Sequence, residues 1–340
     1  MLRKLRLRQP SKPSDKLGKL NGSKSGRTRR TVCAALALGV LGGLAVFGWH
    51  QYERSHTHTL ARDISTTNVA AHIAGDSTAT EPLLLHQHGM LYFGGFEGTP
   101  WAKSMDAQVA SSEHASIVNG AGVFGSKALR TTYAQGSYGS YASPAGTSST
   151  IFKIPFGSNG ANIGMHDDLY FRFMVKFEPG FQFGKSGKLP GLAGGTSNTA
   201  GNPPNGTDGW SGRLDWVGNG GLISYLYVPG IKKYGLELTW NVAGKTTQLV
   251  QPGKWACLEM RYQMNTPGQP NGIAQGWLNS KVALDNHNIN FRSTSKLGID
   301  NILFSTFFGG ATADYASPQN QYADFDSFAV ATQYIPCPGQ

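Results

Sequence analysis

The chain has 340 residues and a formal net charge of +10, which is long enough for one large domain with additional segments. Eleven of its 30 Lys and Arg residues lie in residues 1–30 beside a single acid, Asp15, and the remainder holds 19 basic and 19 acidic residues. The basic charge therefore belongs to the N-terminal segment. The rest of the chain offers no electrostatic basis for nucleic-acid binding, and we expect no nucleic acid as a partner.

The basic segment, residues 1–30, precedes a run without a charged side chain. This run, TVCAALALGVLGGLAVFGW, spans 19 residues (31–49), about the length that crosses a bilayer. Arginines stand directly before it, so the positive-inside rule predicts a cytoplasmic N-terminus and export of everything that follows, to the periplasm or the exterior. We expect an uncleaved single-pass membrane anchor. A cleaved signal peptide, which would release a secreted protein, is the alternative, but the basic segment is long for one and no A-x-A site follows.

Residues 50–88 are polar and have no sustained period, which predicts a flexible linker. Two His-x-His pairs lie in this segment, at positions 56 and 58 and at positions 86 and 88. Neither pair has an acidic or cysteine partner at the spacing of a metal site. We therefore expect no metal and no other cofactor.

From residue 89 onward, short runs of alternating apolar and polar residues are separated by Gly, Pro and Asn. In LYFRFMVKFEP five alternate positions are apolar and would share one face of a strand: Leu169, Phe171, Phe173, Val175 and Phe177. The runs YGLELTW, KWACLEMRY, GWLNSKVALD, NILFSTFF and YADFDSFAV repeat the pattern, and helical periodicity is nearly absent. We predict an all-β fold over residues 89–340, a β-jelly roll or concanavalin-like sandwich.

Export changes the interpretation of the cysteines, because an oxidising compartment allows a pair to form a disulfide. Cys257 lies in the strand-like run KWACLEMRY, and Cys337 lies in the final YIPCPGQ. We predict a bridge between them that fastens the C-terminus to the domain. Two free thiols are the alternative.

A glycine-rich segment, GKSGKLPGLAGG, spans residues 184–195 and contains Lys188. We interpret it as a loop, because glycines permit unusual dihedral angles and close approach of the backbone. A lysine there could project into a groove. A solvated lysine in a turn is the alternative from this segment alone.

Residues 210–229, WSGRLDWVGNGGLISYLYVP, predict a β-hairpin in which one face carries chemically active side chains. Alternate positions of a strand share a face, and here these positions hold Ser211, Arg213, Asp215, Tyr225 and Tyr227.

The length of the turn decides which of these side chains are opposite one another. A three-residue loop, Gly218–Gly220, or a loop two residues longer places Arg213 opposite Tyr225 and Ser211 opposite Tyr227. A two-residue turn would shift the register by one and separate Arg213 from the tyrosine face. A strand with an ordinary hydrated outer face is the alternative to a functional cluster.

Several signatures of other chemistries are missing from the sequence. There is no G-x-S-x-G motif for serine hydrolysis, and no E-x-D-x-x-E pair of the kind expected for a two-carboxylate glycosidase.

The motifs that remain resemble those of polysaccharide lyase family 14, the family of alginate lyases. In order, they are GKLPGLAGG, S-x-R, Y-x-Y twelve residues after the arginine, KWACLEMRYQMNTPGQPNGIAQGWLNSK, FSTFFGG and YADFDSF. The resemblance covers residues 90–335. It implies a β-jelly roll that cleaves 1,4-linked polyuronates by β-elimination. It also implies that the functional residues are Lys188, Ser211, Arg213, Tyr225 and Tyr227.

The chemistry of a uronate lyase suits these residue types. The enzyme must remove H5, which lies alpha to a carboxylate, and expel O4. Arg213 could neutralise the carboxylate through a bidentate pair, and Ser211 could donate a hydrogen bond to the same group. Tyr225 is the candidate base and could also be the acid, with Tyr227 assisting; we expect Arg213 and Lys188 to lower the Tyr225 pKa. Lys188 as the base is the alternative.

We therefore expect a membrane-anchored, exported lyase acting on β-1,4-linked uronates, either poly-mannuronate or glucuronan. Its partners would be an acidic polysaccharide and, through residues 31–49, the membrane, and the protein would be a monomer. A carbohydrate-binding sandwich without catalysis is the main alternative, and a glycoside hydrolase is the third.

Overall fold

The structure is a computed structural model that describes residues 72–74, 84, 87–123, 127–139 and 148–338. The predicted cytoplasmic tail and anchor, residues 1–30 and 31–49, lie outside the described residues, as does most of the predicted linker. Within the described part of the chain, no helix combines the length and apolar composition needed to cross a membrane.

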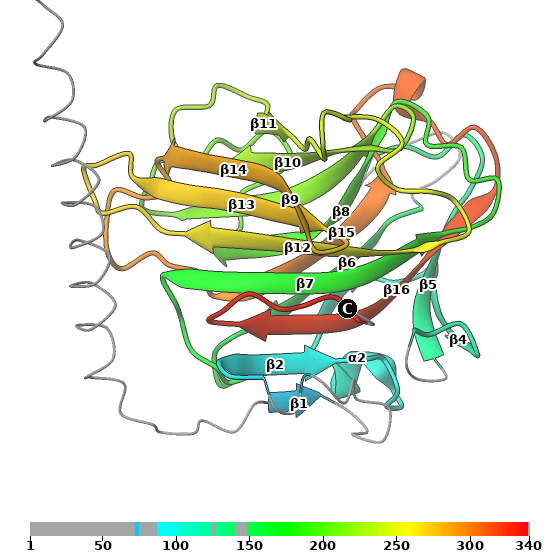
Figure 1. The fold of residues 1–340 in the computed structure, drawn as a ribbon, viewed down its shortest axis with the longest axis horizontal. Helices are drawn as coiled ribbons and strands as arrows, with labels where there is room; N and C mark the ends of the chain where they lie inside the picture. The colour runs from blue at the N-terminus through cyan, green and yellow to red at the C-terminus, as the bar shows by residue number, and fades with distance from the viewer. Residues whose placement is uncertain (1–71, 75–83, 85–86, 124–126, 140–147, 339–340) are drawn as a thin grey trace, which may run out of the picture. The chain divides into compact units, whose positions relative to one another are not determined.

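Two β-sheets, called here sheet A and sheet B, make up the described part of the chain (Figure 1). In sheet A the strands follow the order β1 (His72–Ala74), β2 (Met90–Gly94), β16 (Gln321–Ala331), β7 (Asp168–Phe177), β12 (Trp255–Gln263), β13 (Gly272–Leu278) and β14 (Lys281–Ile289), and β5 (Lys127–Tyr133) pairs with β16 and with β4 (Ala115–Asn119). All neighbours are antiparallel except β1 and β2, which are parallel. β1 lies inside residues 50–88, where we predict a linker.

Sheet B has seven strands, and all its neighbours are antiparallel. Their order is β11 (Leu236–Thr239), β10 (Gly221–Tyr227), β9 (Gly209–Val217), β8 (Ser186–Gly195), β15 (Asn301–Phe308), β6 (Thr150–Pro155) and β3 (Gln108–Ser111). Only short helical turns accompany the sheets among the described residues, namely α2 (Trp101–Ser104) and η3 (Ala313–Tyr315). The all-β sandwich expected from the alternating sequence runs is therefore confirmed.

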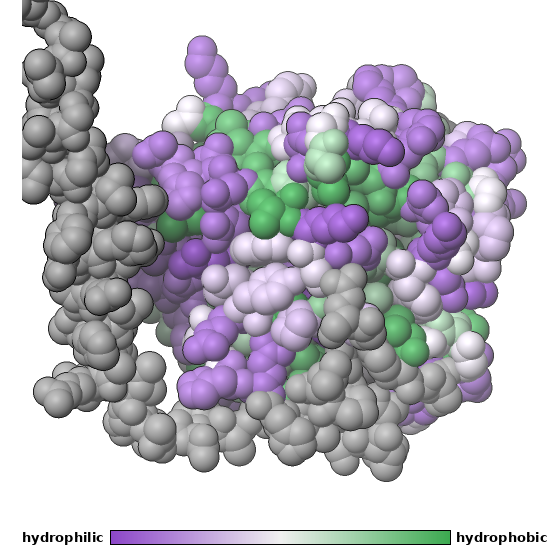
Figure 2. Space-filling view, viewed as in Figure 1, coloured by the Kyte–Doolittle hydropathy of each residue, from purple (hydrophilic) through white to green (hydrophobic). Residues whose placement is uncertain are grey.

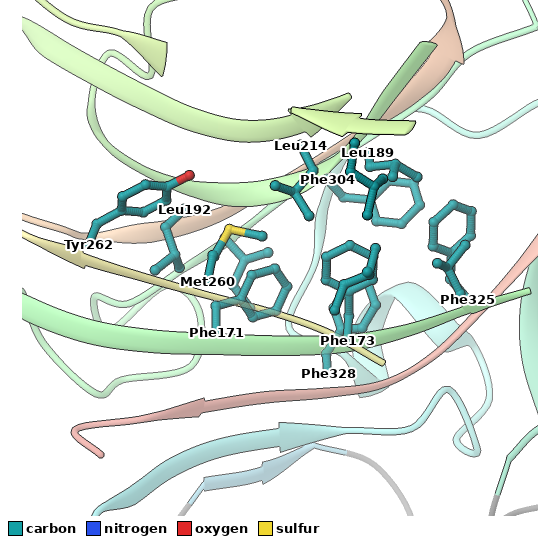
Figure 3. Packing of buried hydrophobic residues seen from close by; sticks show 14 of the residues in the cluster. Phe171, Phe173, Leu189, Leu192, Leu214, Met260, Tyr262, Phe304, Phe325 and Phe328 are labelled. Atoms are coloured by element: carbon teal, nitrogen blue, oxygen red, sulfur yellow. The ribbon is translucent and has the colours of Figure 1, made fainter. Parts of the chain in front are cut away.

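The hydrophobic core lies between the two sheets (Figure 3). Alternation explains which side chains enter it, because successive residues of a strand point to opposite faces. Phe171 and Phe173 of β7 point inward from sheet A, and Leu189 and Leu214 of sheet B are fully buried in the same cluster. With the inner faces used for packing, the outer faces remain for other purposes.

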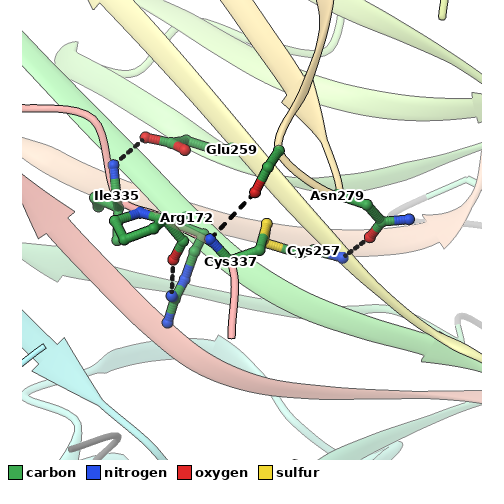
Figure 4. Close-up of a disulfide and its surroundings, with 8 residues drawn as sticks. Arg172, Cys257, Glu259, Asn279, Ile335 and Cys337 are labelled. Atoms are coloured by element: carbon green, nitrogen blue, oxygen red, sulfur yellow. Dashed lines mark hydrogen bonds between the residues drawn. A yellow bond between two sulfur atoms is a disulfide. The ribbon is translucent and has the colours of Figure 1, made fainter. Parts of the chain in front are cut away.

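The C-terminal segment covers part of the outer face of sheet A (Figure 4). A disulfide joins Cys257 on β12 to Cys337, and the two Cα atoms are 6.0 Å apart. Beside it, the backbone N–H of Ile335 donates to Glu259 (2.8 Å), and Arg172 donates to the carbonyl of Pro336 (2.7 Å). Elsewhere on the side of the molecule seen in Figure 2, hydrophilic and intermediate residues are mixed with smaller hydrophobic areas.

We expect the disulfide to contribute substantially to stability, because its two cysteines are 80 residues apart in the chain. Cys337→Ser should lower the free energy of unfolding by about 2–5 kcal/mol, measured by urea denaturation of the full chain. In the unaltered protein, alkylation without reduction should label neither Cys257 nor Cys337, and alkylation after reduction in denaturant should label both. Quantitative labelling of the unreduced protein would contradict this prediction.

Candidate active site

The β9–β10 hairpin has the register expected from an odd-length loop. The strands are joined by three residues, and Gly218 (φ 47°) and Gly220 (φ 68°) adopt the left-handed region that favours glycine. Arg213 consequently pairs directly with Tyr225, and Ser211 with Tyr227. The predicted clustering of these side chains on one face is confirmed.

The segment that carries Lys188 is a strand, and its interpretation as a loop was wrong. Residues 186–195 form β8 in the middle of sheet B, where Lys188 pairs with Asp215 of β9. Its glycines serve close packing: a Cβ on Gly187 would lie 1.8 Å from the Trp216 ring. Pro190, which lacks an N–H donor, stands at a β-bulge where the register shifts. The strand therefore accepts residues that normally argue against a central strand.

The side chains expected to be functional lie on the outer face of sheet B. Leu214 of β9 belongs to the core cluster, so its neighbours Arg213 and Asp215 point to the opposite face. The side chains on this outer face are nevertheless buried, since Arg213 is 4% exposed and Tyr225 is 8% exposed. An ordinary hydrated face, the alternative considered from the sequence, does not describe this surface.

Two segments bind to this face through the residues expected to be functional. The Ser211 hydroxyl donates to the carbonyl of Asn198 (2.6 Å), so its proton is directed to the loop between β8 and β9. The Tyr227 hydroxyl accepts from the N–H of Gly201 in the same loop (3.0 Å) and donates to the carbonyl of Lys233 (3.4 Å). Ser211 and Tyr227 thus hold the loops that border the site.

Lys188, Tyr225 and Arg213 form the ionisable centre of the face. The Lys188 Nζ atom lies 3.7 Å from the centre of the Tyr225 ring and forms an ion pair with Asp215. Arg213 Nη1 donates to the Ser305 hydroxyl of β15 (3.0 Å). One amine, one guanidinium and one phenol are therefore held within three adjacent strands.

Asp215 is a site residue that the sequence places on the functional face, through its spacing to Arg213, without indicating a role for it. No local pattern reveals its partner, because the glycines and the proline around Lys188 are typical of a loop. In the structure Asp215 is 2% exposed, and its Oδ1 atom has no hydrogen-bond partner among the described residues. Pairing with Lys188 accounts for the presence of a buried carboxylate here.

Burial favours the neutral forms of Tyr225, Lys188 and Asp215. The pKa of Tyr225 is raised, mainly because burial disfavours the phenolate, so the expectation of a lowered Tyr225 pKa was wrong. Burial also lowers the pKa of Lys188, and the neighbouring Arg213 lowers it further, against the opposing effect of Asp215. The pKa of Asp215 is raised by burial. At this centre a phenol able to donate a proton therefore stands beside an amine able to accept one.

A cavity of about 690 Å³ lies away from this centre, beside the β9–β10 turn. None of its lining residues is ionisable, so it offers neither an acid, a base nor a cation for an acidic sugar: Phe181, Gln182, Phe183, Gly184, Gly218, Asn219, Gln248, Val250, Gln251 and Pro252. Among the described residues no cluster of three or more His, Cys, Asp or Glu side chains could hold a metal ion. The outer face of sheet B is therefore the best-supported site.

The fold is shared with solved alginate lyases. The crystal structure of the marine PL-14 alginate lyase from Aplysia kurodai superposes with a TM-score of 0.60 at 23% identity, covering 72% of this chain and 99% of that chain. Alginate lyase vAL-1 from Chlorella virus gives 0.55 at 23% identity, over 66% and 91% of the two chains. Alginate lyase Aly36B gives 0.55 at 20% identity, over 72% and 94%. No curated protein matches the sequence.

The family model described as Polysaccharide lyase 14 matches residues 123–328, a range that contains all five side chains expected from the resemblance to be functional. This match covers more than half of the chain, and it agrees with the fold shared with the alginate lyases. The chain belongs to the polysaccharide lyase 14 family.

Proposed function

We propose that the protein is a polysaccharide lyase that cleaves a 1,4-linked uronate polymer by β-elimination. The observation that carries the proposal is the pairing of Arg213 with Tyr225 across two strands, with the Lys188 amine stacked on the same ring. A cation for the substrate carboxylate and two proton-transfer groups thus share one buried face. The alginate lyases with this fold act on a polymer of this class.

The proposed reaction begins with the carboxylate of the sugar that will carry the new double bond. Arg213 binds this group, because a guanidinium presents paired donors that match a carboxylate. Neutralising the carboxylate makes H5 more acidic, since negative charge builds up at C5 as the proton leaves. The electrons of the C5–H5 bond then form the C4–C5 double bond, and the C4–O4 bond breaks.

Lys188 and Tyr225 supply the proton transfers in this proposal. The lowered pKa of Lys188 favours the free amine, which removes H5, and the raised pKa of Tyr225 favours the phenol, which protonates the departing O4. A proton then passes from the Lys188 ammonium to the Tyr225 phenolate and restores both groups. Both side chains lie on one face, which suits a substrate whose H5 and O4 leave on the same side. Tyr225 acting alone as base and acid is the alternative.

The substrate class is tested by following elimination directly. The product carries a C4–C5 unsaturated uronate that absorbs in the ultraviolet. The polymers to be tested are alginate blocks, glucuronan and hyaluronan. We expect an absorbance gain with poly-mannuronate or with glucuronan. New reducing ends without absorbance would indicate a hydrolase. Binding without any new ends would indicate a non-catalytic carbohydrate-binding protein.

We expect Arg213→Ala to lower kcat/KM by about two to three orders of magnitude, the usual loss when a group that stabilises transition-state charge is removed. Arg213→Lys keeps the charge but loses the planar pair of donors, so it should recover only part of the rate. The initial rate of absorbance gain measures both variants, and circular dichroism checks their folding. Folded Arg213→Ala protein with the parental kcat/KM would contradict the assignment.

For location, we propose that residues 31–49 anchor the enzyme in a membrane with the lyase domain outside the cytoplasm. The support is the uncharged 19-residue run and its arginine-rich flank. The disulfide between Cys257 and Cys337 is in keeping with an oxidising compartment.

A further inference from the structure

Lys153 of β6 lies in the same row of sheet B as the proposed catalytic residues. It pairs with Leu303 of β15, Leu303 pairs with Gly191 of β8, and Gly191 pairs with Arg213. Arg213 in turn pairs with Tyr225. Directly paired residues share a face of the sheet, so the Lys153 side chain is on the outer face together with Arg213 and Tyr225.

The burial pattern of β6 agrees with this placement. Phe152 and Ile154, on either side of Lys153, are fully buried in the core between the sheets, and Lys153 is half-buried outside that core. Lys153 also lines a cavity of about 280 Å³ at this end of the sheet, together with Gln108 and Val109 of β3. The cavity therefore adjoins the row that contains the site.

Among the described residues, no hydrogen bond or ion pair of the Lys153 side chain is found. Asp300 acts on it electrostatically, but the two Asp300 carboxylate oxygens accept from the Gly195 N–H (2.8 Å) and from the Asn301 amide (2.6 Å). Burial lowers the pKa of Lys153, which means that its ammonium form is partly desolvated without a direct counter-ion. An anion bound in the adjoining cavity would compensate that charge.

A role in protecting the sheet edge does not account for Lys153. Lysines are often placed on edge strands, where they prevent pairing with another chain. Here β3 is the edge strand, and β6 lies inside it with partners on both sides.

Within the row, Lys153 is separated from Arg213 by three strand spacings, about 14 Å, a span longer than a single sugar ring.

We propose that Lys153 and its cavity form a distal subsite that binds the carboxylate of a uronate several sugars away from the cleaved bond. The inference rests on the proposed function in that it takes the substrate to be a polyuronate lying across the strands of sheet B. It places the polymer along the row from Tyr225 to Lys153. It makes Lys153 a determinant of affinity for long chains and leaves the chemical step to Arg213, Lys188 and Tyr225.

Binding can be tested without turnover in a Tyr225→Phe background of the full chain, by electrophoresis in gels containing poly-mannuronate or glucuronan. Adding Lys153→Ala should weaken retardation in the gel. The apparent Kd should rise about three- to tenfold, the effect of losing one partly buried charged contact. Lys153→Arg should restore most of it. Lys281→Ala, which removes an exposed lysine of β14 on the other sheet, is the matched control and should bind as the background does.

Kinetics on the otherwise unaltered enzyme separate a distal subsite from a role at the cleaved bond. Lys153→Ala should raise KM for the polymer about three- to tenfold and change kcat much less. It should have little effect on a trisaccharide, which is too short to reach Lys153 when one of its bonds lies at Arg213. Unchanged retardation and unchanged polymer KM would overturn the inference, and so would an equal effect on the trisaccharide. Failure of the unaltered enzyme to cleave any uronate would instead count against the proposed function, while the gel experiment would still decide whether Lys153 binds the polymer.

Discussion

Tyr225→Phe is expected to lower turnover by about two to four orders of magnitude, the usual contribution of a general acid–base group. The substitution removes one oxygen with almost no change in volume, and substrate binding should change much less than kcat. The physical reason is that burial keeps Tyr225 protonated, so its hydroxyl is available to protonate O4 as the C4–O4 bond breaks. Initial rates of absorbance gain on poly-mannuronate and glucuronan measure the loss.

Folding needs its own control, because the Tyr225 hydroxyl also accepts a hydrogen bond from the Gly235 N–H (3.0 Å). Circular dichroism and thermal unfolding should show that Tyr225→Phe remains folded. The matched control is Tyr227→Phe. It removes a hydroxyl that contacts Gly201 and Lys233 and so holds the bordering loops. A folded Tyr225→Phe protein that keeps more than about a tenth of the parental turnover, far short of the expected loss, would exclude Tyr225 from proton transfer.

Lys188→Gln is expected to lower turnover by a similar two to four orders of magnitude, if Lys188 removes H5. Glutamine keeps a hydrogen-bond donor for Asp215 but cannot accept a proton from carbon. The loss of positive charge beside Asp215 should not unfold the protein, because the pKa of Asp215 is already raised by burial and the carboxyl group can take up a proton. Thermal unfolding checks this expectation.

The pH dependence of kcat/KM distinguishes the two candidate bases. In the unaltered enzyme the rate should rise with pH as Lys188 loses its proton, and fall at higher pH as Tyr225 loses its own. Burial lowers the first pKa and raises the second, so the active range lies between them. Lys188→Gln should abolish the rising limb. If that limb persists and turnover stays above about a tenth of the parental value, Tyr225 is the base as well as the acid.

The sequence alone determined the elements whose evidence is local. Alternation in the run containing Phe171 and Phe173 predicted a strand with one buried face, because side chains in a strand alternate between faces. For the hairpin, the sequence limited the pairing to two registers: an odd loop such as Gly218–Gly220 places Arg213 opposite Tyr225, and the observed pairing selects that register over a two-residue turn. The ordered motifs pointed to the family that the match over residues 123–328 establishes.

Only the tertiary structure decided the properties that depend on distant segments. Glycine and proline around Lys188 favour a loop by local propensity. In the fold, Trp216 and the backbone of β9 occupy the space that side chains at Gly187 and Gly191 would need, so the glycines allow this segment to pack as a central strand. This pairing brings Lys188 to Asp215, a contact across 27 positions of the chain that no local pattern reveals. Likewise, the pKa of Tyr225 depends on its burial in the folded protein, where the Lys188 amine of another strand lies over its ring. The expected proximity of Arg213 and Lys188 predicted a lowered value, and desolvation, which is a property of the folded state, reverses it.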